Sequence, residues 1–329
     1  MAIGSGLGSS IGLAPEATYG TYVAPTKFIE GTCQLNRDIS TYQGGGMAAG
    51  QTVQRGSRRK VASERVSGSL DVGVMSLGMG NLLNGLMGGT VTPQQQGLTT
   101  AYLQTHALAD PFGKRYTIQA GVPQVTGTVV PYSFLGSQIN SGEFSCETGG
   151  GLTAKFNIAA KSATTAQTLA APSYPNANDF HFAISTLKLG TFGAEALVDG
   201  VKSVSVSIER PKHAGGPYMG GGGFRSEGVM NDFTKISGSM TVDFLDKTTF
   251  ADRFLLDQST SLIWEFVGPT IAGAFKETFR IKIPLIFFEG DLPSASGPDV
   301  VSTTFKFTGL FDGTNPAATI EYISTETTL

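Results

Sequence analysis

A seven-residue phrase that occurs twice constrains the fold of this chain more than any other feature. Val66–Val72 (VSGSLDV) returns as Ile236–Val242 (ISGSMTV), an offset of 170 residues (236 − 66). Both copies alternate apolar residues with small or polar ones, which is typical of a half-buried β-strand. Related segments flank both copies in the same order, so the sequence predicts two tandem copies of one β-rich unit.

The second copy contains the clearest strand pattern. Three apolar residues alternate there with three serines: Val204, Val206 and Ile208 with Ser203, Ser205 and Ser207. This pattern predicts a strand with one apolar and one hydroxylated face. Each copy ends on a further alternating segment, at 153–158 and 302–307.

Between these strands, apolar residues at helical spacing predict one helix in each copy, over 75–87 and 248–258. We expect a hairpin after each helix. One would turn at Gly268-Pro269, and the other would join 101–108 to Tyr116-Thr117-Ile118 through the turn at 110–113.

The fold class expected from these elements is mainly β (α+β), with two tandem β-sandwich domains. Each sandwich would carry one flanking α-helix and long projecting loops. The expected boundaries are an N-terminal arm (1–27), a first domain (28–160), a linker (161–190), a second domain (191–315) and a C-terminal tail (316–329).

Composition agrees with a turn-rich β protein, because the chain of 329 residues has 44 glycines and only 15% charged residues. The net charge of −3 argues against nucleic-acid binding by the chain as a whole. No apolar run reaches the roughly 18 residues that cross a membrane, and 1–12 lacks the features of a signal peptide. Cys33 and Cys146 are expected to remain thiols.

Two glycine-rich loops at equivalent places are the candidate contact sites. Their residues are Tyr42, Gly44, Gly45 and Gly46 in the first loop, and Tyr218, Gly220, Gly221, Gly222 and Arg225 in the second. Loops this long are usually functional, so we expect both to project towards partners.

The first loop also holds the one basic cluster of the sequence, formed by Arg55, Arg58, Arg59 and Lys60. Three interpretations remain open for it: the positive half of a contact between subunits, a DNA-binding patch, or a solvated loop. Glu289 and Asp291 are one candidate for an acidic partner.

No catalytic, metal or cofactor site is predicted. Gly8–Gly12 (GSSIG) matches the pattern of a nucleophile elbow but lacks the strand before it and the helix after it. His106, His181 and His213 lie in separate segments without other ligands at metal-binding spacing. An esterase built on Ser10 remains an alternative that an activity assay would reveal.

The N-terminal segment Gly6–Pro25 (GLGSSIGLAPEATYGTYVAP) resembles the start of the tail tube proteins, or major tail proteins, of long-tailed bacteriophages. The resemblance implies a β-sandwich with one flanking helix and a structural role in the virion. Single-domain members form hexameric rings that stack into a tube. A duplicated member would therefore form pseudo-hexameric rings of three subunits, around a channel through which DNA passes on infection.

The resemblance also implies the partners: other copies of this chain, the tape measure, the tail terminator and the distal tail protein. It implies no cofactor, no specific nucleic-acid binding and no membrane binding, with assembly in the cytoplasm of a bacterial host. A sheet with one polar face can join equivalent sheets edge to edge into a ring. Ser203, Ser205 and Ser207 are then candidates for the channel lining, unless they simply face solvent. The alternatives are an inner tube protein of a contractile tail or injection system, and a tail fibre or adhesin module.

Overall fold

The protein was described from a computed structural model that covers residues 5–213, 215–245, 247–290, 292–294, 298 and 300–329. Asp291, one of the two acidic candidates, lies outside the described residues. The described chain is mainly β, which confirms the expected class. The first half contains β1 (Ser10–Pro15), β2 (Lys27–Ile29), β3 (Gly31–Gln43), β4 (Arg59–Gly73), β5 (Gln94–Gln95), β6 (Tyr102–Ala107), β7 (Tyr116–Pro123), β8 (Val129–Glu147), β9 (Thr153–Ala160) and β10 (Ser162–Thr164). The second half contains β11 (Ser185–Thr191), β12 (Ala194–Leu197), β13 (Val201–Glu209), β14 (Lys212–His213), β15 (Val229–Met230), β16 (Lys235–Asp243), β17 (Thr260–Ala272), β18 (Phe275–Gly290), β19 (Ser302–Gly309) and β20 (Thr319–Ser324).

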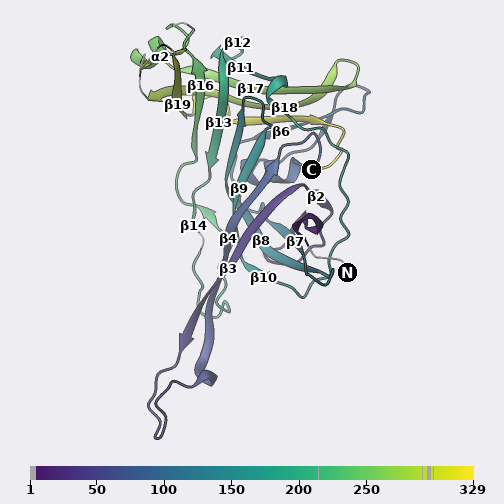
Figure 1. The fold of residues 1–329 in the computed structure, drawn as a ribbon, viewed down its shortest axis with the longest axis vertical. Helices are drawn as coiled ribbons and strands as arrows, with labels where there is room; N and C mark the ends of the chain where they lie inside the picture. Colours follow the sequence, from purple (N-terminus) through teal and green to yellow (C-terminus); the bar gives the residue numbers. More distant parts are fainter. Residues whose placement is uncertain (1–4, 214, 246, 291, 295–297, 299) are drawn as a thin grey trace.

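One antiparallel sheet runs through both halves of the molecule (Figure 1). Its central strands follow the order β3-β4-β9-β8-β13-β16-β19-β18. The halves meet where the C-terminal part of β8 pairs with β13, with Ser145 opposite Ser205. The two halves are therefore joined by main-chain hydrogen bonds as well as by the linker.

A second set of strands extends from the other ends of β8 and β18. The N-terminal part of β8 pairs with β7 and β10, while β1 lies between β7 and β2. The N-terminal part of β18 pairs with β17 and β20, while β11 lies between β17 and β12. Apolar side chains from both halves form one core, in which the rings of Phe144 and Phe279 lie 5.5 Å apart.

The two helices are shorter than expected. Helix α1 (Gly80–Met87) is buried along its whole length and ends at Gly88, which has a left-handed φ of 86°. Gly78 also has a positive φ, of 88°, so the chain turns there and the helix begins two residues later. Helix α2 (Ala251–Leu255) follows Phe250, whose ring stacks on Phe305 at 5.2 Å. Neither helix in the described part of the chain is long enough to cross a membrane.

The expected N-terminal arm and C-terminal tail contain core strands. Residues 10–15 form β1, which is buried and pairs with β7 and β2. Residues 319–324 form β20, which pairs with β18 and β6. Residues 1–27 were expected to form an arm, but Ile11 and Leu13 of this segment are buried in the core.

The predicted second-half hairpin forms, with Leu262 of β17 opposite Ile283 of β18, but its turn was misplaced. Gly268 and Pro269 lie inside β17, where the register shifts between Val267 and Thr270, and the chain turns later, near Gly273. The first-half hairpin does not form at all, because β6 pairs with β5 and β20 while β7 pairs with β1 and β8.

The repeated phrase occupies the same register in both halves. Gly68 lies opposite Leu35 and Ile158, and Gly238 lies opposite Val206 and Phe307. A Cβ atom on Gly68 would approach the carbonyl oxygen of Gln34 to 1.9 Å. One on Gly238 would approach that of Ser205 to 2.3 Å. The phrase therefore keeps its glycine because the neighbouring strand passes too close for a side chain.

Candidate functional site

The three candidate serines lie together on the polar face of β13. Val204, Val206 and Ile208 are buried on the opposite face of the strand. The same alternation continues across the neighbouring strands. The residues of this polar face are Thr32, Gln34 and Asn36 on β3; Ser67, Ser69 and Asp71 on β4; Thr153, Lys155 and Asn157 on β9; Ser141, Glu143 and Ser145 on β8; Ser203, Ser205 and Ser207 on β13; Ser237, Ser239 and Thr241 on β16; and Thr304, Lys306 and Thr308 on β19.

Side-chain hydrogen bonds connect neighbouring strands along this polar face. The oxygen–oxygen distances are 2.9 Å for Ser205–Ser239, 3.0 Å for Ser145–Thr153 and 2.9 Å for Thr241–Thr304. Asn157 donates through Nδ2 to Ser141 Oγ at 2.7 Å. Each such bond contributes about 1 kcal/mol. The face is thus hydrophilic, and these hydrogen bonds hold its side chains in place.

Acidic residues outnumber basic ones on the polar face. The acidic ones are Asp38, Asp71, Glu143, Glu147, Glu209, Asp243 and Glu289, against the basic Arg65, Lys155, Lys202, Lys235 and Lys306. Three of the lysines are paired with carboxylates, since Lys155 lies 3.8 Å from Asp71, Lys202 lies 2.6 Å from Asp243 and Lys235 lies 3.9 Å from Glu209. The surplus negative charge repels nucleic-acid phosphates.

The first candidate loop is the end of a long hairpin formed by β3 and β4, which projects away from the rest of the molecule (Figure 1). Tyr42 lies near the end of β3, Arg59 and Lys60 begin β4, and the other candidates lie in the turn between them. All of the basic cluster is exposed. Arg58 Nη1 donates to Gly45 O at 3.0 Å and Arg55 Nε to Gln51 Oε1 at 3.1 Å, so two of its four cations bind within the hairpin itself.

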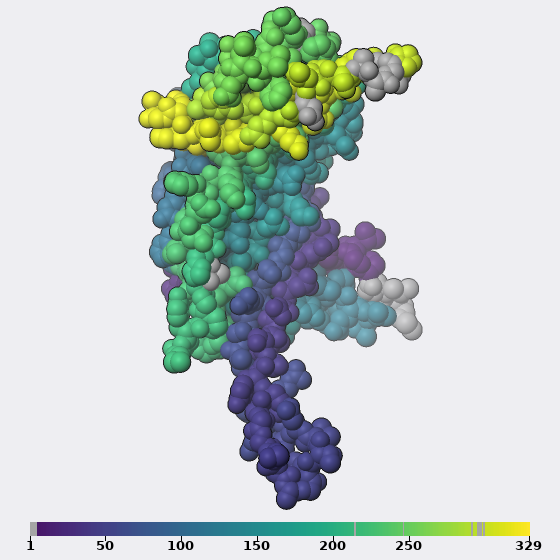
Figure 2. Space-filling view, turned by 90° about the vertical axis from the view of Figure 1, so that its left-hand side faces the viewer, coloured from purple at the N-terminus to yellow at the C-terminus, as the bar shows by residue number. Residues whose placement is uncertain are grey.

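The second candidate loop does not project. It runs back along the first half of the molecule and reaches the base of the hairpin (Figure 2), where Glu64 N donates to Gly223 O at 3.1 Å. Glu227 pairs with Arg115 at 2.5 Å, and Gly228 N donates to Gln138 Oε1 at 2.9 Å. The turn of this loop carries exposed Tyr218, Gly220, Gly221 and Gly222, with Arg225 half-buried. The prediction that both loops project was therefore wrong for the second, because polar groups of the first half bind it.

Sequence reasoning missed Glu16, which organises the N-terminal segment. Its buried carboxylate accepts hydrogen bonds from Gly20 N and Thr117 Oγ1, each at 2.8 Å, and from Gly136 N at 2.9 Å. Arg115 donates to the carbonyl of Ala17 next to it. Residues Glu16–Gly20 belong to the segment that carries the family resemblance. The structure gives a physical reason for the glutamate, because its carboxylate accepts the hydrogen bonds that hold this loop in place.

Two buried cations under the second loop were also missed. Arg210 is almost fully buried and donates through Nη2 to Ala109 O at a short distance. Burial lowers its pKa to about 10. Lys212 Nζ donates to Ile139 O at 2.7 Å, and burial together with neighbouring Arg210 lowers its pKa to about 8. Both side chains donate hydrogen bonds to main-chain carbonyls of the first half, and so hold the start of the second loop against it.

The histidines and cysteines lie apart. His106 is buried on β6 with Nε2 3.2 Å from Gln104 Oε1, and desolvation lowers its pKa to about 3. His181 lies before residues 182–184, and His213 lies on β14. No group of three potential metal ligands occurs in the part of the chain that the structure describes. Cys33 and Cys146 are free, and burial raises the pKa of the Cys33 thiol to about 11.

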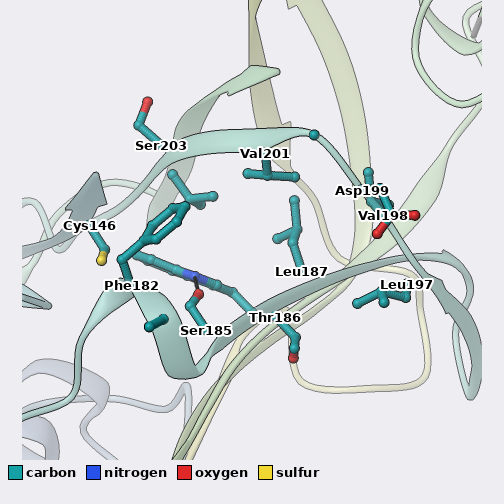
Figure 3. A pocket seen from close by; sticks show the side chains of 14 residues that line it. Cys146, Phe182, Ser185, Thr186, Leu187, Leu197, Val198, Asp199, Val201 and Ser203 are labelled. Carbon is teal, nitrogen blue, oxygen red and sulfur yellow. Dashed lines mark hydrogen bonds between the residues drawn. The ribbon is translucent and has the colours of Figure 1, made fainter. Parts of the chain in front are cut away.

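A cavity of about 300 Å³ lies where the linker meets the second half (Figure 3). Phe182, Leu187, Leu197 and Val201 point into it, and Trp264 Nε1 donates to Ser185 Oγ at 3.0 Å at its wall. Its lining is mostly apolar, with Asp199 at the rim, so it offers no pair of groups for acid–base or nucleophilic chemistry.

Comparison with known proteins gives one family. No curated protein sequence matched the chain. A family model described as "Phage tail tube protein" matches residues 6–309, which include β1, both copies of the repeated phrase and the polar face. Members of that family are structural components of the virion tail. The chain therefore belongs to the phage tail tube protein family.

Proposed function

We propose that this protein polymerises as stacked trimeric, pseudo-hexameric rings, which form the hollow tail tube through which DNA passes on infection. The observation that carries the proposal is the pairing pattern of the strands. The order β3-β4-β9-β8 in the first half has its counterpart in β13-β16-β19-β18 in the second.

Several of the remaining strands follow the same rule. β7 and β10 flank the N-terminal part of β8 as β17 and β20 flank that of β18, and β1 and β11 occupy matching places. This agreement supports a duplicated unit. The two units would then span β1–β10 and β11–β20, wider than the domains expected from sequence, because β1 and β20 belong to the repeats.

The joint between the two units suggests how chains join to one another. Within the chain, the end of β8 in the first unit pairs with β13 in the second. Among the described residues, β3 pairs with β4 alone, so the edge equivalent to that of β13 is open. A second chain can supply the end of β18, the equivalent of β8. Three chains joined in this way close a ring of six units without open sheet edges.

In such a ring the polar face would line the channel, with Ser203, Ser205 and Ser207 in each wall. An acidic, hydroxyl-rich lining binds DNA weakly, as a conduit requires. The two loops would contact neighbouring rings or subunits, and the tape measure, terminator and distal tail proteins would act at the lumen and the tube ends. Assembly would take place in the cytoplasm of the bacterial host.

Electron microscopy of the purified protein, alone and with its tail partners, tests the proposal. The expected result is hollow tubes built of stacked rings. Protein that stays monomeric even with those partners present would contradict it. Gln34 O faces β4, so the N–H of the preceding Cys33 faces the open edge of β3, and a variant with proline in place of Cys33 should remain folded and fail to assemble.

A further inference from the structure

An apolar patch is exposed at one end of the second unit. Phe233 is 89% exposed, Leu310 48% and Phe311 64%. These residues lie together because β16 and β19 pair with Ile236 opposite Gly309, so Phe233 precedes one strand where Leu310 and Phe311 follow the other. Aromatic side chains this exposed and clustered mark a contact surface.

The equivalent place on the first unit is covered by the chain itself. Leu310 N donates to Leu285 O at 2.9 Å, as Lys161 N donates to Leu135 O at 2.8 Å. Lys161 and Ser162 therefore correspond to Leu310 and Phe311, and the offset of the repeated phrase relates Ser63 to Phe233. The second loop lies over this part of the first unit, with Gly223 and Phe224 against Glu64.

The second loop reaches that position because of the strand from which it departs. It leaves β13, which is paired with β8, and Arg210 N extends that pairing by donating to Asn140 O at 2.7 Å. The equivalent departure point in the first unit is β3, whose loop is the projecting hairpin. If β3 pairs with β18 of another chain, its hairpin leaves towards the equivalent place on that chain, which is the apolar patch.

We propose that the β3–β4 hairpin of one chain covers the patch of Phe233, Leu310 and Phe311 on the second unit of the neighbouring chain in the same ring. This inference rests on the proposed function. The hairpin has matching chemistry, because its exposed side chains include Ile39, Tyr42, Met47, Val53 and Val61. The contact between chains would thus repeat the contact that the second loop makes within one chain.

Photo-crosslinking in assembled tubes tests the proposal directly. The photoreactive residue p-benzoylphenylalanine is placed at Val53 or at Tyr42, and at Leu98 as an exposed control outside the hairpin. Peptides are mapped by mass spectrometry after irradiation. Crosslinks from both hairpin positions to a peptide that contains Phe233 or Leu310-Phe311 of a second chain are expected. Crosslinks only between hairpins, only to the first unit, or none at all would overturn the proposal.

Substitution of the patch gives an independent readout. The double variant Phe233→Ser and Phe311→Ser should unfold at the wild-type temperature, because both side chains are exposed, and should assemble at least about tenfold more slowly. Leu98→Ser is the matched control and should assemble normally. Normal assembly of the double variant would overturn the inference while leaving the tube itself in place. Failure of the wild-type chain to form tubes would contradict the proposed function, and the inference with it.

Discussion

At the scale of single residues, the sequence was most informative at positions where only glycine fits. The two glycines of the repeated phrase were found from the sequence, and their reason became visible only with the neighbouring strand in place. Glu16 shows the converse, because its phrase was visible but its three hydrogen-bond donors come from residues 20, 117 and 136. The burial of Arg210 could not be predicted from the residues around it in the sequence. It depends on contacts with Ala109 and Asn140 of the first half.

Alanine at either glycine of the repeated phrase should destabilise the protein. The added Cβ would lie 1.9 Å from Gln34 O in Gly68→Ala and 2.3 Å from Ser205 O in Gly238→Ala, so the strands must move apart. We expect the free energy of unfolding to fall by about 1–3 kcal/mol in each variant, as measured by urea denaturation. Gly73→Ala is the control, because a Cβ there meets no atom within 4 Å. Equal stability of all three variants would contradict the packing described for the phrase.

Acid should destabilise the subunit through His106. Its pKa is lowered to about 3 in the folded state from an ordinary value of 6.5, so between these pH values the unfolded chain binds the additional proton. The stability contributed by neutral His106 is therefore present above pH 6.5 and is lost as the pH falls towards 3, by at most about 1.4 kcal/mol per pH unit. Denaturant titrations from pH 7 to pH 4 should show a shallower slope of stability against pH for His106→Gln than for the wild type. Parallel curves for wild type and His106→Gln would refute this origin of the acid sensitivity.

At the scale of elements, strand positions were predictable and strand partners were not. The closing strands β9 and β19 were expected almost within their observed bounds, because alternation is a local property of the sequence. The hairpin between β6 and β7 was wrong, because β6 pairs with β20 from the far end of the chain. Apolar surface buried by such distant partners outweighs the local turn signal at 110–113.

Shortening the β3–β4 hairpin should abolish assembly and leave folding unchanged. Replacing residues 45–57 by Asn-Gly closes the hairpin at Gly44 and Arg58, whose backbones are already hydrogen-bonded at 3.2 Å. The removed residues lie outside the core, so the melting temperature should stay unchanged while tube formation is lost. Calorimetry and electron microscopy report the two properties. Tubes of normal length from the shortened chain would exclude residues 45–57 from the assembly contacts.

At the scale of the whole molecule, the proposal that the polar face lines the channel can be tested by changing the charge of that face. Reversing the charge of two acidic residues of that face on strand β8, in Glu143→Lys with Glu147→Lys, should leave assembly intact because both side chains are exposed. The tubes should then retain double-stranded DNA, with an affinity that falls steeply as salt is raised. Fluorescence binding to open tubes measures this, with Glu30→Lys, outside the polar face, as the control. DNA retention equal to that of wild type would indicate that the face does not line the channel.

The central claim is that one chain supplies two equivalent units, so that three chains complete a ring of six. Cryo-electron microscopy of the assembled tubes, with the number of chains in each ring counted from the map, tests it most directly. The account predicts three chains per ring, a continuous inner wall in which β18 of one chain pairs with β3 of the next, and near-sixfold symmetry of that wall. Six chains per ring, or a wall in which the β3 edge stays unpaired, would contradict it.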